Sequence, residues 1–96
     1  MQKVLFVCAQ HMDFESNGEK IKGTSLKYLE KTEKGGVKGI YPGKEWLKPE
    51  CTELIAKASQ LVPGQLIDLD FSIEGRRVIL SDIIPGELAV DFDSIL

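Results

Sequence analysis

Apolar and polar residues alternate at both ends of the chain and follow a helical period between them. Residues 3–15 begin with the apolar run 4–7 and continue in looser alternation, which predicts a strand that starts in the core. Asn17-Gly18 follows, and because both residue types accept positive φ, a tight hairpin turn is expected there. Residues 20–31 are then predicted to form the return strand.

The middle of the chain contains a glycine inside a strand, a short third strand and a helix. Gly23 predicts a bulge or a sharp bend in the return strand. Residues 37–42 predict a third short strand that a Pro-Gly pair closes. Within residues 49–61 the apolar positions recur at helical spacing, and Pro49 suits a first helical turn, so this segment predicts an α-helix.

After the helix, the period returns to two. Residues 67–73 alternate between apolar and polar, a glycine turn follows, and residues 76–84 are the predicted hairpin partner. Three meandering strands, a helix and a hairpin follow the order of a five-stranded OB-type (oligonucleotide/oligosaccharide-binding) Greek-key barrel. We therefore expect a mainly β domain over residues 1–86, with one helix at about 49–61 between strands three and four. In such barrels the second and third strands and their loops form the ligand face.

Charge is distributed unevenly over this expected fold. The net charge of −3 over 96 residues argues at first against a nucleic-acid partner. Residues 16–48 nevertheless contain eight lysines and four acids, and the last eleven residues contain three acids and no cation. The cations thus gather on the predicted ligand face, residues 20–48, together with both tyrosines and the tryptophan.

Lysines combined with aromatic rings predict a surface for single-stranded nucleic acid, since cations hold the phosphates and rings stack on the bases. Two arginines near the last hairpin add phosphate contacts or stacking guanidinium groups. The candidate nucleic-acid-binding residues are Lys20, Lys22, Lys27, Tyr28, Lys31, Lys34, Lys38, Tyr41, Lys44, Trp46, Arg76 and Arg77.

These residues also have a purely structural interpretation. Lysines on exposed strands commonly keep a sheet edge soluble, and one or two of the three aromatic residues are expected in the core. Strand phase places Tyr28 on the same face as Lys20 and Lys22, and this face is exposed if Ile21 and Leu29 point inward. The arginines have the alternative of an ion pair with a nearby carboxylate, which contributes little stability when exposed.

The acidic end of the chain, residues 87–96, has two interpretations. Its alternating apolar residues predict a sixth strand. Alternatively, it is a flexible tip that competes with DNA for the basic face and docks on partner proteins. The partner-binding candidates of this tail are Asp91, Phe92, Asp93, Ile95 and Leu96.

Other chemistry has little support in the sequence. Cys8-x-x-His11 is one half of a metal site and lacks a second pair of ligands, so we expect no metal and no cofactor. Both cysteines are expected to be reduced. The chain has one histidine and no phosphate-binding or hydrolase motif, so a non-enzymatic protein is expected. No apolar run approaches a membrane span and no signal peptide is evident, which predicts a cytoplasmic protein.

The chain resembles the small single-stranded-DNA-binding proteins of phages and mobile elements, above all the filamentous-phage helix-destabilising type. The resemblance rests on the length, the lysine- and tyrosine-bearing second and third strands, and the segment PGQLIDLDFSIEGRRVILSDIIP. The tail is similar to the acidic, hydrophobic tip of bacterial single-strand-binding proteins. Two features depart from the pattern: the overall acidity and the length of the predicted helix.

This resemblance implies a homodimer that coats single-stranded DNA during replication or transfer, and a tail that contacts replication proteins. RNA remains an open alternative as the ligand. The rival hypothesis is an OB-fold protein-interaction module, such as an accessory subunit of a replication or conjugation complex, which binds no DNA of its own.

Overall fold

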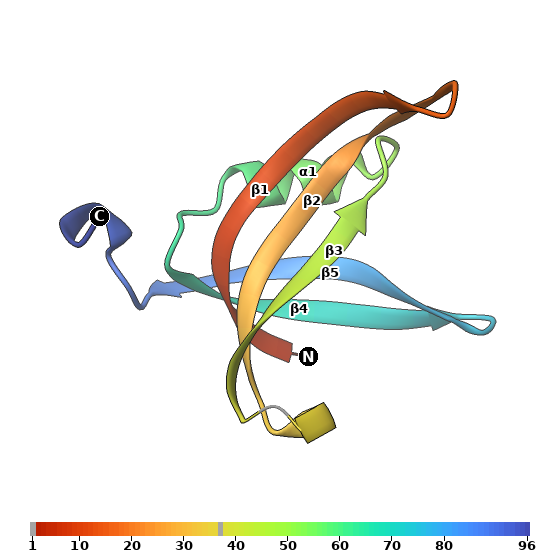
Figure 1. The fold of residues 1–96 in the computed structure, drawn as a ribbon. Helices are drawn as coiled ribbons and strands as arrows, with labels where there is room; N and C mark the ends of the chain where they lie inside the picture. The colour runs from red at the N-terminus through yellow and green to blue at the C-terminus, as the bar shows by residue number, and fades with distance from the viewer. Residues whose placement is uncertain (1, 37) are drawn as a thin grey trace.

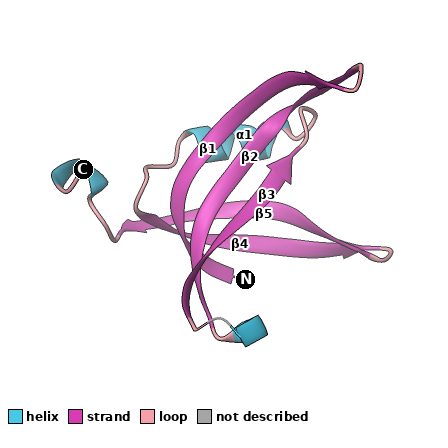
Figure 2. Cartoon of the chain, viewed as in Figure 1, coloured by secondary structure: helices cyan, strands magenta, loops and turns pink. Residues whose placement is uncertain are grey.

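The protein is mainly β, with five strands and one α-helix (Figures 1 and 2). The computed structural model describes residues 2–36 and 38–96. The elements are β1 (Gln2–Ser16), β2 (Glu19–Thr32), η1 (Lys34–Gly36), β3 (Gly39–Leu47), α1 (Thr52–Ser59), β4 (Gln65–Glu74), β5 (Arg77–Leu88) and η2 (Phe92–Ser94), where η denotes a 3₁₀-helix.

All five strands belong to one antiparallel sheet with the order β3-β2-β1-β4-β5. β1 pairs with β2 almost from end to end but with β4 only through residues 2–5, so the two hairpins diverge, as Figure 1 shows. β3 and β5 are the two edge strands and the sheet is not closed between them. The mainly β prediction, with a helix between strands three and four, is confirmed, whereas the closed barrel is not.

The core lies between one face of the sheet and α1. Leu26 of β2 and Leu69 of β4 are completely inaccessible to solvent. α1 contributes Ala58, and the partly buried Leu54 and Ile55 pack against the same cluster. The remaining buried apolar residues are Val4, Phe6, Tyr28, Leu47, Ile67, Leu80 and Ile83.

The turn between β1 and β2 agrees with its sequence signal. Asn17 has φ 54° and Gly18 has φ 79°, so both adopt the left-handed conformation that a two-residue hairpin turn requires. The expected bulge at Gly23 is wrong, because Gly23 pairs in regular register with Met12. The register shift of this hairpin lies instead in β1, between Phe6 and Cys8.

β3 is longer than predicted, because the chain continues through Pro42 and Gly43 without turning. Pro42 pairs with Leu29, and Gly43 pairs with Tyr28. Proline is tolerated there since β3 is an edge strand, whose outward-facing backbone needs no hydrogen-bonding partner in the sheet. The glycine leaves room for the Tyr28 ring, which a Cβ atom on Gly43 would overlap.

α1 is shorter than the predicted helix. Pro49 and Glu50 form a turn before it, closed by the Cys51 N–H, which donates to the Lys48 carbonyl at 2.9 Å. Cys51 is the N-cap residue, and its φ of −82° and ψ of 59° lie outside the helical region, so the helix begins only at Thr52.

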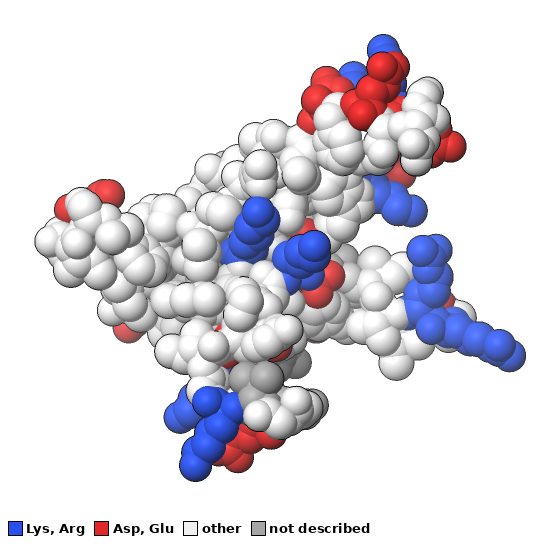
Figure 3. Space-filling model, in the orientation of Figure 1, with Lys and Arg blue, Asp and Glu red and all other residues white. Residues whose placement is uncertain are grey.

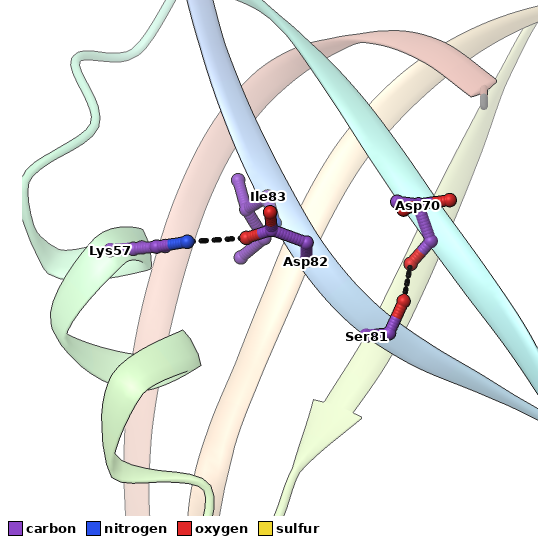
Figure 4. Close-up of polar contacts among 5 residues, drawn as sticks. All are labelled: Lys57, Asp70, Ser81, Asp82 and Ile83. Carbon is purple, nitrogen blue, oxygen red and sulfur yellow. Dashed lines mark hydrogen bonds and ion pairs between the residues drawn. The ribbon is translucent and has the colours of Figure 1, made fainter.

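An ion pair ties α1 to β5. Lys57 of α1 reaches Asp82 of β5, and Asp82 also accepts the Ile83 backbone N–H at 2.9 Å (Figure 4). The Lys57 ammonium and this backbone donor together lower the pKa of Asp82. Beside them, the Ser81 hydroxyl donates to the Asp70 carbonyl at 3.0 Å, across the register shift of the β4–β5 hairpin.

The chain end is attached to the domain by its backbone. β5 extends to Leu88, and the backbone N–H groups of Ala89 and Val90 both donate to the Gly64 carbonyl, at 2.9 and 3.1 Å. The single turn η2 follows (Figure 1). The predicted sixth strand is therefore wrong, and the first two residues of the predicted tail, 87 and 88, belong to β5. Among the described residues, no helix has the length and apolarity to cross a bilayer.

Candidate nucleic-acid interface

Strand register assigns the side chains of β1, β2 and β3 to two faces. Leu26 and Tyr28 lie on the core face together with their neighbours Glu45 and Gly43 on β3. The residues between them therefore point to the opposite face, which we call the outer face. Figure 1 shows α1 behind β1 and β2, so the outer face of these strands is toward the viewer.

Three adjoining hollows follow β2 along the outer face. The first has a volume of about 470 Å³ and the second about 380 Å³, and Lys27 and Lys44 line both of them. The third, of about 230 Å³, shares Leu29 with the second. Because neighbouring hollows share these lining residues, we call the three together the outer-face trough.

Trp46 provides a flat aromatic surface at one end of the trough. Its indole lies over Gly23, where any Cβ atom would overlap the ring. The residue is 44% exposed, so one side of the indole packs on the sheet and the rest faces solvent. The absence of a side chain at Gly23 is thus the physical reason that the tryptophan lies flat on the strand.

A second aromatic side chain in the trough was missed by sequence reasoning. Phe14 of β1 is 44% exposed and lines the first hollow, as do Met12 and Ile21. The signal was available: a two-residue turn at 17–18 fixes Phe14 opposite Ile21, and hence on the same face. Apolar side chains from the projecting hairpin therefore face Trp46 across the hollow.

Four lysines follow the trough. Lys27 and Lys44 are directly opposite each other on β2 and β3, and the Lys27 ammonium donates to the Gln10 side chain at 2.9 Å. Lys31, which was predicted, and Lys3, which was not, line the third hollow. In Figure 3 basic side chains stand in the middle of this face, whereas acidic and basic side chains lie together at the tip of the β1–β2 hairpin.

The expectation that the Tyr28 side chain is exposed beside the lysines is wrong, although Tyr28 is among the residues that line the second hollow. Tyr28 is only 6% exposed, since the apolar side of β2 is Leu26 and Tyr28 rather than Ile21 and Leu29. Its hydroxyl donates to Glu45 at 3.3 Å. Burial, reinforced by the charge of Glu45, raises the pKa of Tyr28 to about 12, and burial likewise raises the pKa of Glu45.

Three other candidates lie on the face opposite Trp46. Lys20 and Lys22 share the phase of Leu26, and Lys22 forms an exposed ion pair with Asp13 at 3.9 Å. Tyr41 is 48% exposed and pairs with Glu30. Its side chain therefore lies on the core face of β3, but beyond the end of the hydrophobic core. These residues do not join the outer-face trough.

The remaining basic candidates stand apart from the trough. Arg76 and Arg77 are exposed at the turn between β4 and β5, where Arg77 pairs with Glu74. Figure 3 shows these basic side chains at the tip of that hairpin, away from those over β2. Lys38 is exposed in the loop before β3. The side chain of Lys34 lies outside the described part of the structure.

The tail candidates are mostly exposed. Phe92 is half-buried and lies close to Gly64, whereas Ile95 is 65% and Leu96 is 96% exposed. Asp91 and Asp93 are exposed on either side of Phe92.

Cys8 and Cys51 are free thiols. Within residues 2–36 and 38–96, no three His, Cys, Asp or Glu side chains come together at metal-binding distance.

Comparison with known proteins identifies no relative: no protein-family model, no curated protein and no solved structure matches this chain. The functional argument therefore rests on the residues of the outer-face trough.

Proposed function

We propose that this protein binds single-stranded DNA without sequence preference, in the replication or transfer of a phage or mobile element. The observation that carries the proposal is the outer-face trough, in which Trp46 and Phe14 lie beside the lysine pair Lys27 and Lys44. Single-stranded nucleic acid needs both components, because bases stack on rings while phosphates follow cations. RNA offers the same chemistry and is the alternative ligand.

We propose that the fold is an OB-type barrel left open between its edge strands. The strand order and the helix between β3 and β4 support this assignment. The trough follows β2 and β3, the strands that form the ligand face in OB folds.

The segregation of charge supports an anionic ligand despite the net charge of −3. The two acids on the part of β2 and β3 beside Lys27 and Lys44 are Glu30 and Glu45, and strand register assigns both to the core face. Glu45 accepts a hydrogen bond from Tyr28, and Glu30 accepts one from Gln2. Glu30 nevertheless lines the third hollow, and Asp68 lies opposite Lys3. The first and second hollows, which Lys27 and Lys44 line, have no acidic residue in their lining.

Trp46 is the only tryptophan, so its fluorescence reports directly on the trough. Oligo-dT should quench it at low salt, and quenching should weaken between about 50 mM and about 200 mM salt as phosphate contacts release counterions. Absence of both quenching and a gel shift at low salt would refute the proposal. Trp46→Ala, followed by the anisotropy of a labelled oligonucleotide, should weaken binding roughly 5- to 150-fold, since a base–ring stack contributes ~1–3 kcal/mol.

A matched aromatic control is Tyr41→Ala. Tyr41 is as exposed as Trp46 but lies on the opposite face, so its removal should change affinity less than twofold by the same stacking argument. If Tyr41→Ala weakens binding as much as Trp46→Ala, the DNA does not follow the trough.

A second candidate function, self-association or protein docking through the β4–β5 hairpin, has its own support. Ile73 is 77% and Val78 is 69% exposed, and they form a cross-strand pair that continues the apolar core face beyond the core. Glu74 and Arg77 form the next cross-strand pair, whose side chains point to the opposite face, so the apolar pair stands on its face without a charged neighbour from that pair.

We propose that a second copy of this chain covers the hairpin, giving a homodimer. Solution mass with and without oligo-dT tests this proposal, and Ile73→Lys should convert a dimer to a monomer. A monomeric native chain would leave this apolar pair for a partner protein, as the rival interaction module requires.

A further inference from the structure

Lys27 and Lys44 are a cross-strand pair of like charges. The register places them directly opposite each other on β2 and β3, both on the outer face. In such pairs the Cβ atoms lie roughly 4.5–5.5 Å apart, and like charges directly opposite are destabilising. The arrangement is therefore unfavourable in the free protein unless something compensates it.

No carboxylate compensates this pair within the described residues. The ion pairs there are Lys22–Asp13 and Lys57–Asp82, which involve neither lysine. The ammonium group of Lys27 donates to the neutral amide oxygen of Gln10, which orients the side chain without reducing its charge.

The pair also occupies a junction in the trough. Lys27 and Lys44 line both the first hollow, with Trp46, and the second hollow, with Leu29 and Pro42. An extended strand in the trough alternates bases with phosphates, and the lysine pair is the charged point between two largely apolar sections.

We propose that Lys27 and Lys44 together clamp one backbone phosphate of the bound strand, and that their repulsion in the free protein is relieved when this phosphate binds. This inference rests on the proposed function and deepens it by assigning one phosphate position. A single anion between two ammonium groups converts an unfavourable pair into a favourable triad. Stability and affinity should therefore respond in opposite directions to the loss of either lysine.

The test is Lys44→Gln, measured for both properties at low salt. Its melting temperature should rise by roughly 1–6 °C, because a like-charge pair is removed from a small domain. Its affinity for oligo-dT should fall about fivefold, and the slope of log affinity against log salt should decrease by about 0.7. Lys44→Glu should raise the melting temperature further and lower the affinity for oligo-dT further, since it places an opposite charge beside Lys27.

The control is Lys20→Gln, which makes the same change of charge on the other face. Lys20 lies opposite Glu15, so this change removes a favourable pair and should not raise the melting temperature. Its effect on oligo-dT affinity should stay below twofold, because the charge lies outside the trough. The clamp is overturned if Lys44→Gln binds as tightly as the native chain, or if it melts no higher than the native chain.

A further measurement separates the clamp from the proposed function. Inorganic tripolyphosphate, compared with chloride at equal ionic strength, should raise the melting temperature of the native chain more than that of Lys44→Gln. If the native chain binds no oligo-dT but shows this difference, the DNA proposal fails while the anion clamp stands. If oligo-dT binds but tripolyphosphate stabilises both chains equally, the clamp fails alone.

Discussion

At the scale of single residues, two aromatic rings lie over two glycines. Trp46 covers Gly23 on the outer face, and Tyr28 covers Gly43 on the core face. Glycine weakens a strand because it supplies no side chain to pack, and a neighbouring ring supplies that missing contact here. The same contact fixes each ring, one as an exposed platform and the other as part of the core.

Gly43→Ala tests this fit. A methyl group at position 43 would overlap the Tyr28 ring, so we expect the free energy of unfolding to fall by roughly 1–3 kcal/mol, the usual cost of overpacking. The midpoint of urea denaturation measures it. In a double-mutant cycle with Tyr28→Leu, the cost of Gly43→Ala should shrink, since the smaller side chain leaves room. Equal costs in both backgrounds would mean that the ring does not occupy this position.

The Tyr28–Glu45 pair predicts a dependence of stability on alkaline pH. The pKa of Tyr28 is raised from 10.0 to about 12, so above pH 10 the unfolded chain loses this proton first. The free energy of unfolding should therefore fall as the pH rises from 10 to about 12. Urea midpoints across this pH interval, for the native chain and for Tyr28→Phe, measure the effect. In Tyr28→Phe, the part of the fall in the free energy of unfolding that comes from Tyr28 should be absent.

Glu45→Gln should lower the pKa of Tyr28, because the charge of Glu45 is the second cause of the shift after burial. Absorbance of tyrosinate in a Tyr41→Phe background isolates Tyr28, since the chain has two tyrosines. The pKa should stay above 10.0, because burial remains. An unchanged pKa would show that the carboxylate does not act on the phenol.

At the scale of elements, the β1–β2 hairpin is longer than its neighbours, and this length forms the site. The part of the hairpin beyond β3 and β4 has no core to cover, yet Met12, Phe14 and Ile21 still line one side of it. Its other side carries Lys20 and Lys22. The apolar side faces Trp46, which gives an exposed hydrophobic surface next to lysines.

The junction of α1, β4 and the chain end depends on Gly64. Gly64 has φ 96°, its N–H donates to the Phe6 carbonyl at 2.8 Å, and the Val90 carbonyl occupies the position of its missing Cβ. Gly64→Ala should therefore lower the free energy of unfolding by roughly 2–4 kcal/mol, from backbone strain and overlap together. In a chain that ends at Leu88, the overlap is gone, so thermal denaturation should show a smaller cost, about 1–2 kcal/mol. Equal costs in the two chains would contradict the overlap.

At the scale of the whole molecule, the lysines of the trough and the acids of the tail occupy separate places. Lysines follow the trough, whereas Asp91 and Asp93 lie in the tail after the backbone contacts to Gly64. The net charge of −3 therefore describes neither region.

Removing residues 91–96 tests what the tail does, and the cut preserves the two hydrogen bonds to Gly64. We expect thermal stability to change little, and oligo-dT affinity at low salt to persist or rise, because two acids that repel phosphates are lost. The gain should vanish at high salt, where screening removes it. A loss of affinity after this truncation would show that the tail contributes to binding rather than opposing it.

The sequence by itself determined the order of elements, the Asn17-Gly18 turn and the concentration of lysines in residues 16–48. The order of elements follows from the local period of apolar residues, and the turn follows from two residues that accept positive φ. Both are properties of short stretches of the sequence. The candidates Lys27, Lys31, Lys44 and Trp46 were recognised from this concentration and lie together on the outer face.

Only the tertiary structure decided which face of β2 is buried. Both faces carry apolar residues, Leu26 and Tyr28 on one and Ile21 and Leu29 on the other, so periodicity alone cannot choose between them. The choice depends on which face the rest of the core packs against, and this packing places Tyr28 in the core. Strand closure, too, depends on the distance between β3 and β5, which no local pattern encodes.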